Sequence, residues 1–213
     1  VDRNALAYVN MSDGSLFTVN TQNAHCTATS YQTGQQGRTI RGMGFSADTS
    51  GGTAETLYTC TSDGLGSGMG LAKIGLPSFG LSPIGDYTGG LAGSECELTG
   101  TGDARLFGFF ALSSPTKLAE ITKTSGATPS PINLTNVPTS SAYAFSFWGG
   151  DFWFYTSTGA PSNTSGHHRC IGTTAILKAM PTPRARRPSQ NTGSIPWSAG
   201  PPRPACAAEV EIT

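Results

Sequence analysis

The sequence predicts an all-β fold made of several short antiparallel sheets that repeat along the chain. The 213 residues include 28 Gly and 14 Pro, and only 12% are charged, which favours many turns and little exposed helix. Short runs of apolar and aromatic residues lie between these turn residues, as expected of strands. The runs also recur at a regular spacing, which indicates that one structural unit is used several times.

One series of predicted strands has an aromatic residue near its middle. The series occupies residues 6–9, 57–60, 106–109 and 152–155. Its aromatic residues are Tyr8, Tyr58, Phe107 and Trp153, which lie 50, 49 and 46 positions apart. This near-constant spacing indicates that each run has the same place in a repeated unit.

A second series has the pattern Leu-x-x-Val/Ile and occupies residues 16–19, 71–74 and 118–121. Seven residues after the last apolar residue of each, a further short run begins, at Cys26, Leu81 and Thr128. Another run, at 43–46, 96–98 and 143–147, precedes three of the aromatic strands. Each complete unit therefore contains four predicted strands in chain order.

Four strands per period of about 40–50 residues is typical of β-propeller blades. A small sheet has two apolar faces that it cannot bury alone, and radial stacking buries them between neighbouring sheets. The near-continuous apolar run over 145–155 favours strands that are buried on both faces. We therefore predict a β-propeller-like domain over 1–157, with about three and a half four-stranded blades at 4–34, 40–85, 93–135 and 142–156. A β-sandwich or another β-fold is the alternative.

Two segments resemble the repeats of a known class of proteins. The first segment is residues 15–21 (SLFTVNT), and the second is residues 44–48 (GFSAD) followed by 56–58 (TLY). They resemble the repeats of bacterial secreted β-propellers of the WD40-like and TolB-like kind. The resemblance covers about residues 4–157 and implies a fold but no chemistry. The sequence departs from this class in blade number, because such rings generally close with four to eight blades.

The chain changes composition near residue 157. Residues 1–157 carry 7 Lys/Arg and 11 Asp/Glu, whereas residues 158–213 carry 6 and 2, together with 8 of the 14 Pro. Pro removes the N–H donors of a sheet and clustered Arg side chains repel one another, so we expect 158–213 to be an irregular or disordered tail. Two interpretations of this tail stay open: a native basic, Pro-rich segment, or the frame-shifted end of a longer propeller gene.

The cysteines and histidines give no strong motif. The five cysteines are an odd number, so one chain cannot pair them all; we interpret Cys26, Cys60 and Cys96 as small apolar strand residues, with a disulfide as the alternative. His167, His168 and Cys170 form the one ligand-like cluster, but adjacent histidines rarely bind the same ion. We therefore predict no metal and no cofactor, and no G-x-S-x-G nucleophile motif occurs.

The candidate ligand-binding residues are Asp86, Tyr87 and Glu95. Asp86 and Tyr87 precede a loop that leads to Glu95, and loops between an outer strand and the next inner strand commonly line the ligand face of a propeller. Glu95 and Glu97 alternate along one predicted strand, so they are expected on the same face. In this arrangement the three residues would line a polar pocket for a sugar or a cation. The alternative interpretation is that they are solvated loop residues.

The function predicted from these features is a non-catalytic extracytoplasmic binding or scaffolding module with a protein or glycan ligand. The alternatives are a propeller enzyme that acts on a polysaccharide through loop carboxylates, and a truncated fragment without a function of its own. Zero net charge and the absence of a long apolar run predict no nucleic-acid partner and no membrane span. We expect an extracellular or periplasmic location, a chain processed ahead of Val1, and self-association through the open edges of the blades.

Overall fold

The computed structural model describes residues 1–140, 142–157 and 175–177, and within them the chain is all-β, as predicted. No α-helix occurs among these residues, and a single 3₁₀ turn, η1, spans Gln35–Gly37. The strands are β1 (Leu6–Asn10), β2 (Leu16–Asn20), β3 (Cys26–Ala28), β4 (Thr39–Ala47), β5 (Glu55–Ser62), β6 (Gly68–Gly75), β7 (Gly80–Gly85), β8 (Glu97–Gly100), β9 (Leu106–Phe110), β10 (Lys117–Ile121), β11 (Ile132–Asn133), β12 (Ala142–Trp148), β13 (Asp151–Ser157) and β14 (Ala175–Leu177).

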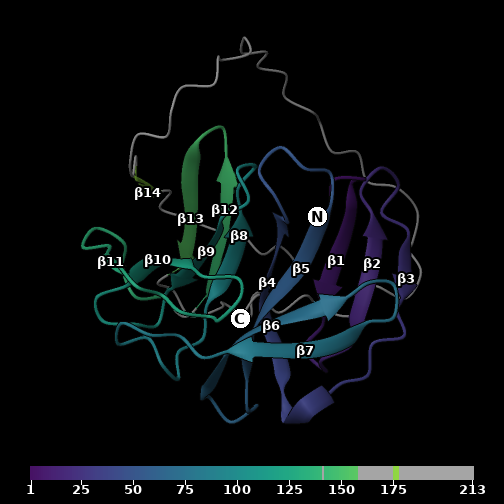
Figure 1. The fold of residues 1–213 in the computed structure, drawn as a ribbon, viewed down its shortest axis with the longest axis horizontal. Helices are drawn as coiled ribbons and strands as arrows, with labels where there is room; N and C mark the ends of the chain where they lie inside the picture. Colours follow the sequence, from purple (N-terminus) through teal and green to yellow (C-terminus); the bar gives the residue numbers. More distant parts are fainter. Residues whose placement is uncertain (141, 158–174, 178–213) are drawn as a thin grey trace, which may run out of the picture.

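These strands form four antiparallel sheets, and within each sheet the strands follow one another in chain order. The first sheet is β1-β2-β3, the second β4-β5-β6-β7, the third β8-β9-β10-β11 and the fourth β12-β13-β14. Figure 1 shows the sheets following one another around the molecule, from β1–β3 on the right, through β6 and β7 below, to β10 and β11 on the left and β12–β13 at the upper left, with β8 beside β12 near the middle.

The hairpins arise from the turn residues that separate the apolar runs. In the β1–β2 hairpin, the carboxylate of Asp13 accepts hydrogen bonds from both the backbone N–H and the hydroxyl of Ser15. Gly14 has a φ of +80°, a left-handed conformation that an L side chain rarely adopts. The register then pairs Tyr8 with Thr18 and Asn10 with Leu16, so Tyr8 and Asn10 lie on one face of the sheet.

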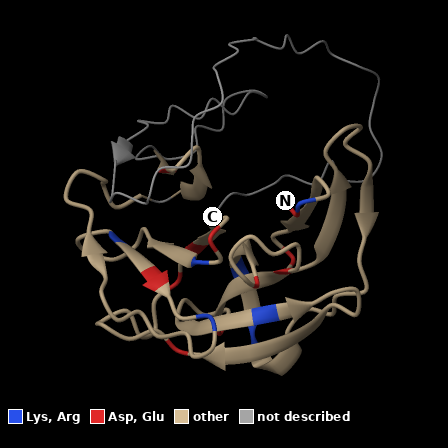
Figure 2. Ribbon diagram, turned by 45° about the horizontal axis from the view of Figure 1, so that its top comes forward, with Lys and Arg blue, Asp and Glu red and all other residues tan. Residues whose placement is uncertain are grey.

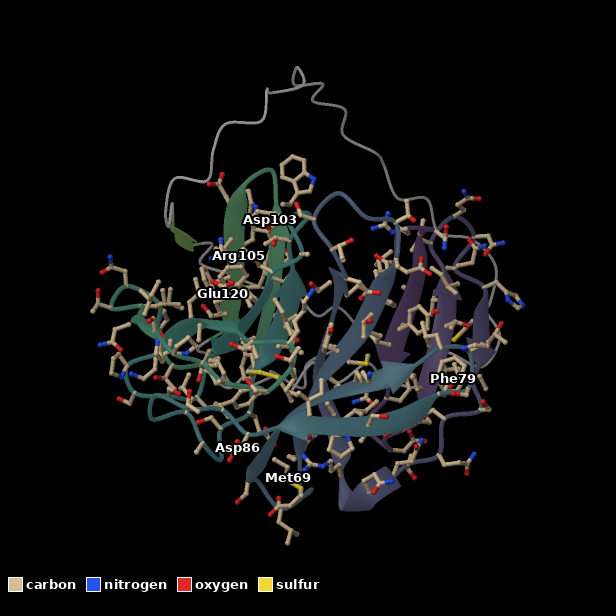
Figure 3. All side chains as sticks on the ribbon, in the orientation of Figure 1. Met69, Phe79, Asp86, Asp103, Arg105 and Glu120 are labelled. Carbon is tan, nitrogen blue, oxygen red and sulfur yellow. A yellow bond between two sulfur atoms is a disulfide. The ribbon has the colours of Figure 1, made fainter. Side chains whose placement is uncertain are left out.

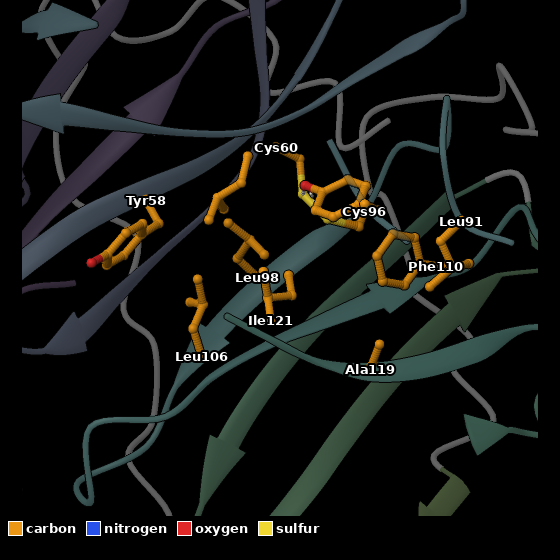
Figure 4. Packing of buried hydrophobic residues seen from close by; sticks show 11 residues of the cluster. Tyr58, Cys60, Leu91, Cys96, Leu98, Leu106, Phe110, Ala119 and Ile121 are labelled. Atoms are coloured by element: carbon orange, nitrogen blue, oxygen red, sulfur yellow. Dashed lines mark hydrogen bonds between the residues drawn. A yellow bond between two sulfur atoms is a disulfide. The ribbon is translucent and has the colours of Figure 1, made fainter. Parts of the chain in front are cut away.

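The sheets pack face against face through three apolar clusters. The first cluster joins the first and second sheets through the strand residues Leu16, Ile40, Leu57, Ala72, Ile74 and Leu81. The second cluster joins the second and third sheets through Tyr58, Cys60, Leu71, Leu98, Leu106, Phe110, Ala119 and Ile121. The third cluster joins the third and fourth sheets through Phe107, Phe109, Leu118, Tyr143, Phe145, Phe152 and Phe154. Figure 4 shows the second cluster from close by. Strand β9 contributes to the second cluster with one face and to the third with the other, which explains why all five of its residues are buried.

The fourth sheet differs from the prediction that its strands are buried on both faces. Its inner face packs on β9, where the rings of Phe109 and Phe154 lie 4.9 Å apart. On its other face Trp148 is 74% and Tyr155 45% exposed. The apolar run over 145–155 therefore reflects one aromatic interface and one open aromatic face, rather than burial on both sides.

Glycine allows the inner strands β4 and β8 to approach closely. A Cβ atom on Gly42 would overlap the Cys96 carbonyl oxygen, and one on Gly44 would lie 2.8 Å from the Leu98 carbonyl group. The backbone N–H of Phe147 in β12 donates a 3.1 Å hydrogen bond to the hydroxyl of Thr99 in β8. Strands β4, β8 and β12 therefore lie next to one another, and side chains from different sheets meet there.

A disulfide between Cys60 and Cys96 joins the second sheet to the segment that leads into the third. Both cysteines are almost completely buried (Figure 4). The hydroxyl of Tyr87 lies 3.2 Å from the Cys60 Sγ and 3.3 Å from the Cys96 Sγ. The interpretation of Cys60 and Cys96 as free apolar residues is therefore wrong. The odd number of cysteines in the sequence obscured a pair that lies 36 residues apart.

Two further expectations differ from the structure. The outer strand of the third sheet does not begin at Thr128, which is instead a buried residue bonded to Thr88 across a loop; β11 starts at Ile132. Within the predicted irregular tail, 175–177 form β14 and pair with β13. The rest of that tail, including His167, His168 and Cys170, lies outside the described residues.

Candidate functional site

A polar cavity lies where the inner strands meet, and we call it the inner-strand cavity. Its volume is about 360 Å³, within the range of small-molecule sites. The side chains that carry its chemistry come from β1, β4, β8 with the residues that precede it, and β12: Tyr8, Asn10, Arg41, Met43, Glu95, Glu97 and Tyr143. All four sheets therefore contribute to its walls.

Arg41 and Glu95 form an ion pair at the edge of this cavity. The Nε atom of Arg41 donates to a carboxylate oxygen of Glu95 at 3.1 Å and to the hydroxyl of Ser62 at 2.9 Å. The side chains are only 30% and 16% exposed, so the pair is shielded from water more than a surface salt bridge. The charges of Arg41 and Glu95 therefore compensate each other within the site.

Glu97 is the unusual residue of the cavity. Burial raises the pKa of its carboxyl group from 4.5 to about 8, so the group is mainly protonated at neutral pH. No described residue donates a hydrogen bond to this carboxyl. Gly42 makes room for it, because a Cβ atom at that position would lie 2.9 Å from Oε2 of Glu97. The fold thus places a carboxyl group in the cavity without giving it a partner.

Two tyrosines border the same space. Tyr143 lies on β12, and its pKa is raised to about 12 by burial and by the neighbouring carboxyl groups of Glu97 and Glu95. Tyr8 lies on β1 and packs edge-on against Phe45 with ring centroids 5.2 Å apart. Burial also raises the pKa of Tyr8. Both phenols stay uncharged at neutral pH.

Asn10 supplies a second unpartnered acceptor beside the cavity. Its Nδ2 donates to the Ile40 carbonyl oxygen at 3.2 Å, but its buried Oδ1 has no donor among the described residues. The buried hydroxyl of Tyr31 also has no hydrogen-bond partner among the described residues. Tyr31 borders an adjoining cavity of about 260 Å³, and Arg41 lines both this cavity and the inner-strand cavity. Such groups are uncommon in folded proteins and often mark places where a ligand or water completes the bonding.

The structure separates the three residues predicted from the sequence. Asp86 is exposed at the lower edge of the view in Figure 3, and it accepts a hydrogen bond from the Tyr87 N–H. Tyr87 is 2% exposed, and its hydroxyl lies at the disulfide in the second apolar cluster. Glu95 lines the inner-strand cavity. Only Glu95 of the three therefore lies in this site.

Most of the residues that surround Glu95 in the cavity are not predicted by any pattern in the sequence. The sequence predicts that Glu95 and Glu97 share a face, and both line the cavity. Asn10, Arg41 and Tyr143 come from three other sheets, and no motif in the sequence connects them. The one available signal was position: each lies on or next to the innermost strand of its sheet.

Comparisons with known proteins give no assignment. No protein-family model matches the chain, and no curated protein matches it. Within 1–140, 142–157 and 175–177, no group of three His, Cys, Asp or Glu residues is placed to hold a metal ion. The same residues contain no helix with the length and apolar character required to cross a bilayer. Figure 2 shows the charged residues of the described part scattered over several sheets.

Proposed function

We propose that this chain is an extracytoplasmic, β-propeller-like binding module and that its ligand occupies the inner-strand cavity. The propeller-like arrangement is supported by four chain-ordered sheets that bury their faces against one another in succession. The buried disulfide supports an oxidising compartment, because such bonds persist mainly outside the cytoplasm. The binding role is non-catalytic, and the candidate ligands are glycans and other small polar molecules.

The observation that carries the proposal is the unpartnered carboxyl group of Glu97. Glu97 lines the cavity, and no described residue donates a hydrogen bond to its carboxyl oxygens. Oδ1 of Asn10, in the same cavity wall, is fully buried without a donor among the described residues, and a buried polar atom of this kind costs about 1–3 kcal/mol. A ligand that bonds to these atoms would offset a cost that folding leaves in place, so the cavity favours an occupied state.

The test is a titration of the full chain with soluble glycans, followed through ¹³C-labelled methionine methyl groups. Met11 and Met43 line the cavity, whereas Met69 does not and serves as an internal control. Binding in the cavity predicts shifts of the Met11 and Met43 signals with the Met69 signal unchanged. Shifts confined to Met69, or equal shifts of all three, would place the ligand elsewhere and contradict the proposal.

A second candidate function is hydrolysis of a polysaccharide. It is favoured by two carboxyl groups in different environments, since Glu95 is ion-paired with Arg41 while Glu97 is held in the protonated form. Such a contrast is a common way to provide one acid and one base in the same site. Release of reducing sugar ends that Glu95→Gln abolishes would support this function. Unchanged release in the variant would show that the activity comes from a contaminant.

A further inference from the structure

We propose that the ligand of the inner-strand cavity is a small organic amine, with the ammonium group of the ligand bound by the carboxylate of Glu97. This inference rests on the proposed binding function and specifies the class of ligand. It follows from three features of the cavity: the balance of charge, the balance of donors and acceptors, and the nature of the walls.

The Glu97 carboxylate has no positively charged partner among the described residues that line the cavity. Arg41 and Glu95 already form an ion pair, and Arg41 Nε is also bonded to Ser62. Tyr8 and Tyr143 are neutral at physiological pH. The carboxylate form of Glu97 therefore has no cation of its own among the described residues, and a ligand with one positive charge would supply it.

The donor balance points in the same direction. The Glu97 carboxylate accepts hydrogen bonds only, and the unpartnered atom of Asn10 is an acceptor too. An ammonium group has three N–H donors and no acceptor, so it matches such a surplus. A phosphate, sulfate or carboxylate ligand would add acceptors and negative charge, and is therefore disfavoured.

The walls of the cavity suit an organic cation better than a metal ion. Tyr8, Tyr143 and Met43 border it, and aromatic and thioether groups tolerate an ammonium with its alkyl chain. A divalent metal requires several oxygen, nitrogen or sulfur ligands, and the described residues offer no group of three. The volume of about 360 Å³ has room for a chain of several carbon atoms.

Amine binding is expected to release a proton. Because burial holds the pKa of Glu97 near 8, a cation that binds to the carboxylate displaces the proton from it at neutral pH. The charged and titratable groups that line the cavity around Glu97 are Arg41 on β4, Glu95 ahead of β8, Tyr143 on β12 and Tyr8 on β1. The ion pair is internally compensated and the phenols keep their protons, so Glu97 dominates the pH dependence.

The experiment compares pentylammonium with 1-pentanol, which has nearly the same shape without the charge. Alkylammonium ions stay protonated to about pH 10, so only the protein titrates between pH 6 and pH 9. The Met11 and Met43 methyl signals of the full chain report binding, with Met69 as the control. With a pKa of about 8, the affinity for pentylammonium at pH 9 should be about tenfold that at pH 7, while pentanol binding should not rise.

Two variants complete the test. Glu97→Gln keeps the size of the side chain and should bind pentylammonium at least about tenfold more weakly at pH 9, with no pH dependence. Glu120→Gln removes a carboxylate that is paired with Arg105 outside the cavity (Figure 3), and it should bind as the unmodified chain does. Thermal unfolding of Glu97→Gln confirms that any lost affinity occurs in a folded protein.

The outcomes separate this inference from the proposed function. Equal affinity for pentylammonium and pentanol, or an affinity for pentylammonium that does not change between pH 7 and pH 9, would overturn the amine assignment. If glycans shift the Met43 signal under the same conditions, the cavity is a binding site for neutral ligands and the proposed function stands. If neither amines nor glycans shift it, both proposals fail.

Discussion

Replacement of Glu97 by glutamine should stabilise the protein, and the gain should grow with pH. In the folded chain burial raises the pKa of Glu97 to about 8, whereas an unfolded carboxyl has the ordinary value of 4.5. Below pH 4.5 both states hold the proton and this group has no effect on stability. Between pH 4.5 and 8 the unfolded state releases the proton while the folded state retains it, so stability falls as pH rises.

The size of this effect follows from the interval between the two pKa values. Each pH unit in the interval costs about 1.4 kcal/mol, so the loss reaches about 5 kcal/mol once the pH exceeds 8, as an upper figure. Glutamine has no proton to lose, and it has nearly the same volume in the space beside Gly42. The variant should therefore match the unmodified protein near pH 4 and exceed its free energy of unfolding by several kcal/mol at pH 9.

Urea unfolding at pH 4, 6 and 9, followed by tryptophan fluorescence, measures this difference. The matched control is Glu120→Gln, because Glu120 is 48% exposed and its bidentate pair with Arg105 is worth less than about 1 kcal/mol at any of these pH values. A difference between Glu97→Gln and the unmodified chain that stays constant from pH 4 to pH 9 would refute the reasoning, because it would show that Glu97 does not titrate in this interval.

Three further predictions concern stability and use the same urea assay. The double variant Cys60→Ala/Cys96→Ala should lose about 4 kcal/mol, the loop-closure value for a separation of 36 residues; a loss below 1 kcal/mol would contradict it. Gly42→Ala should lose several kcal/mol because its methyl group would overlap β8, whereas Gly102→Ala, where nothing lies within 4 Å, should change stability by less than about 1 kcal/mol. Thr116→Val should lose about 1–3 kcal/mol because the buried hydroxyl bonds to two carbonyl oxygens; an unchanged midpoint would show that these bonds contribute nothing.

Much of the strand order was predictable from the sequence because the repeat is local. The positions of Tyr8, Tyr58, Phe107 and Trp153 predicted β1, β5, β9 and β13, and the Leu-x-x-Val/Ile pattern predicted β2, β6 and β10. The stacking of the sheets was predictable because a small sheet has two apolar faces that it cannot bury alone. The prediction of an outer strand at Thr128 was wrong, because a buried threonine that bonds to a distant loop has the same local pattern as a short edge strand.

The candidate site was much less predictable because its residues are close only in space. Glu95 and Glu97 form a local pattern that predicts a shared face. Their neighbours in the cavity are distant in sequence, because Arg41 lies 54 residues before Glu95 and Tyr143 lies 46 residues after Glu97. The raised pKa of Glu97 depends on burial by all of these elements, which no sequence window contains. Tyr87 was misplaced for a similar reason, since its partner atoms belong to a disulfide between distant cysteines.

The covalent bond between Cys60 and Cys96 also bears on how the molecule loses structure. A tether across the interface between the second and third sheets limits how far these sheets can separate, whereas the described residues show no such bond across the interface of β9 with β13. Partial opening should therefore start at the aromatic interface, and the linked pair of sheets should open last and together. Amide hydrogen exchange would resolve this order, with slow exchange in β5 and β8 and faster exchange in β13.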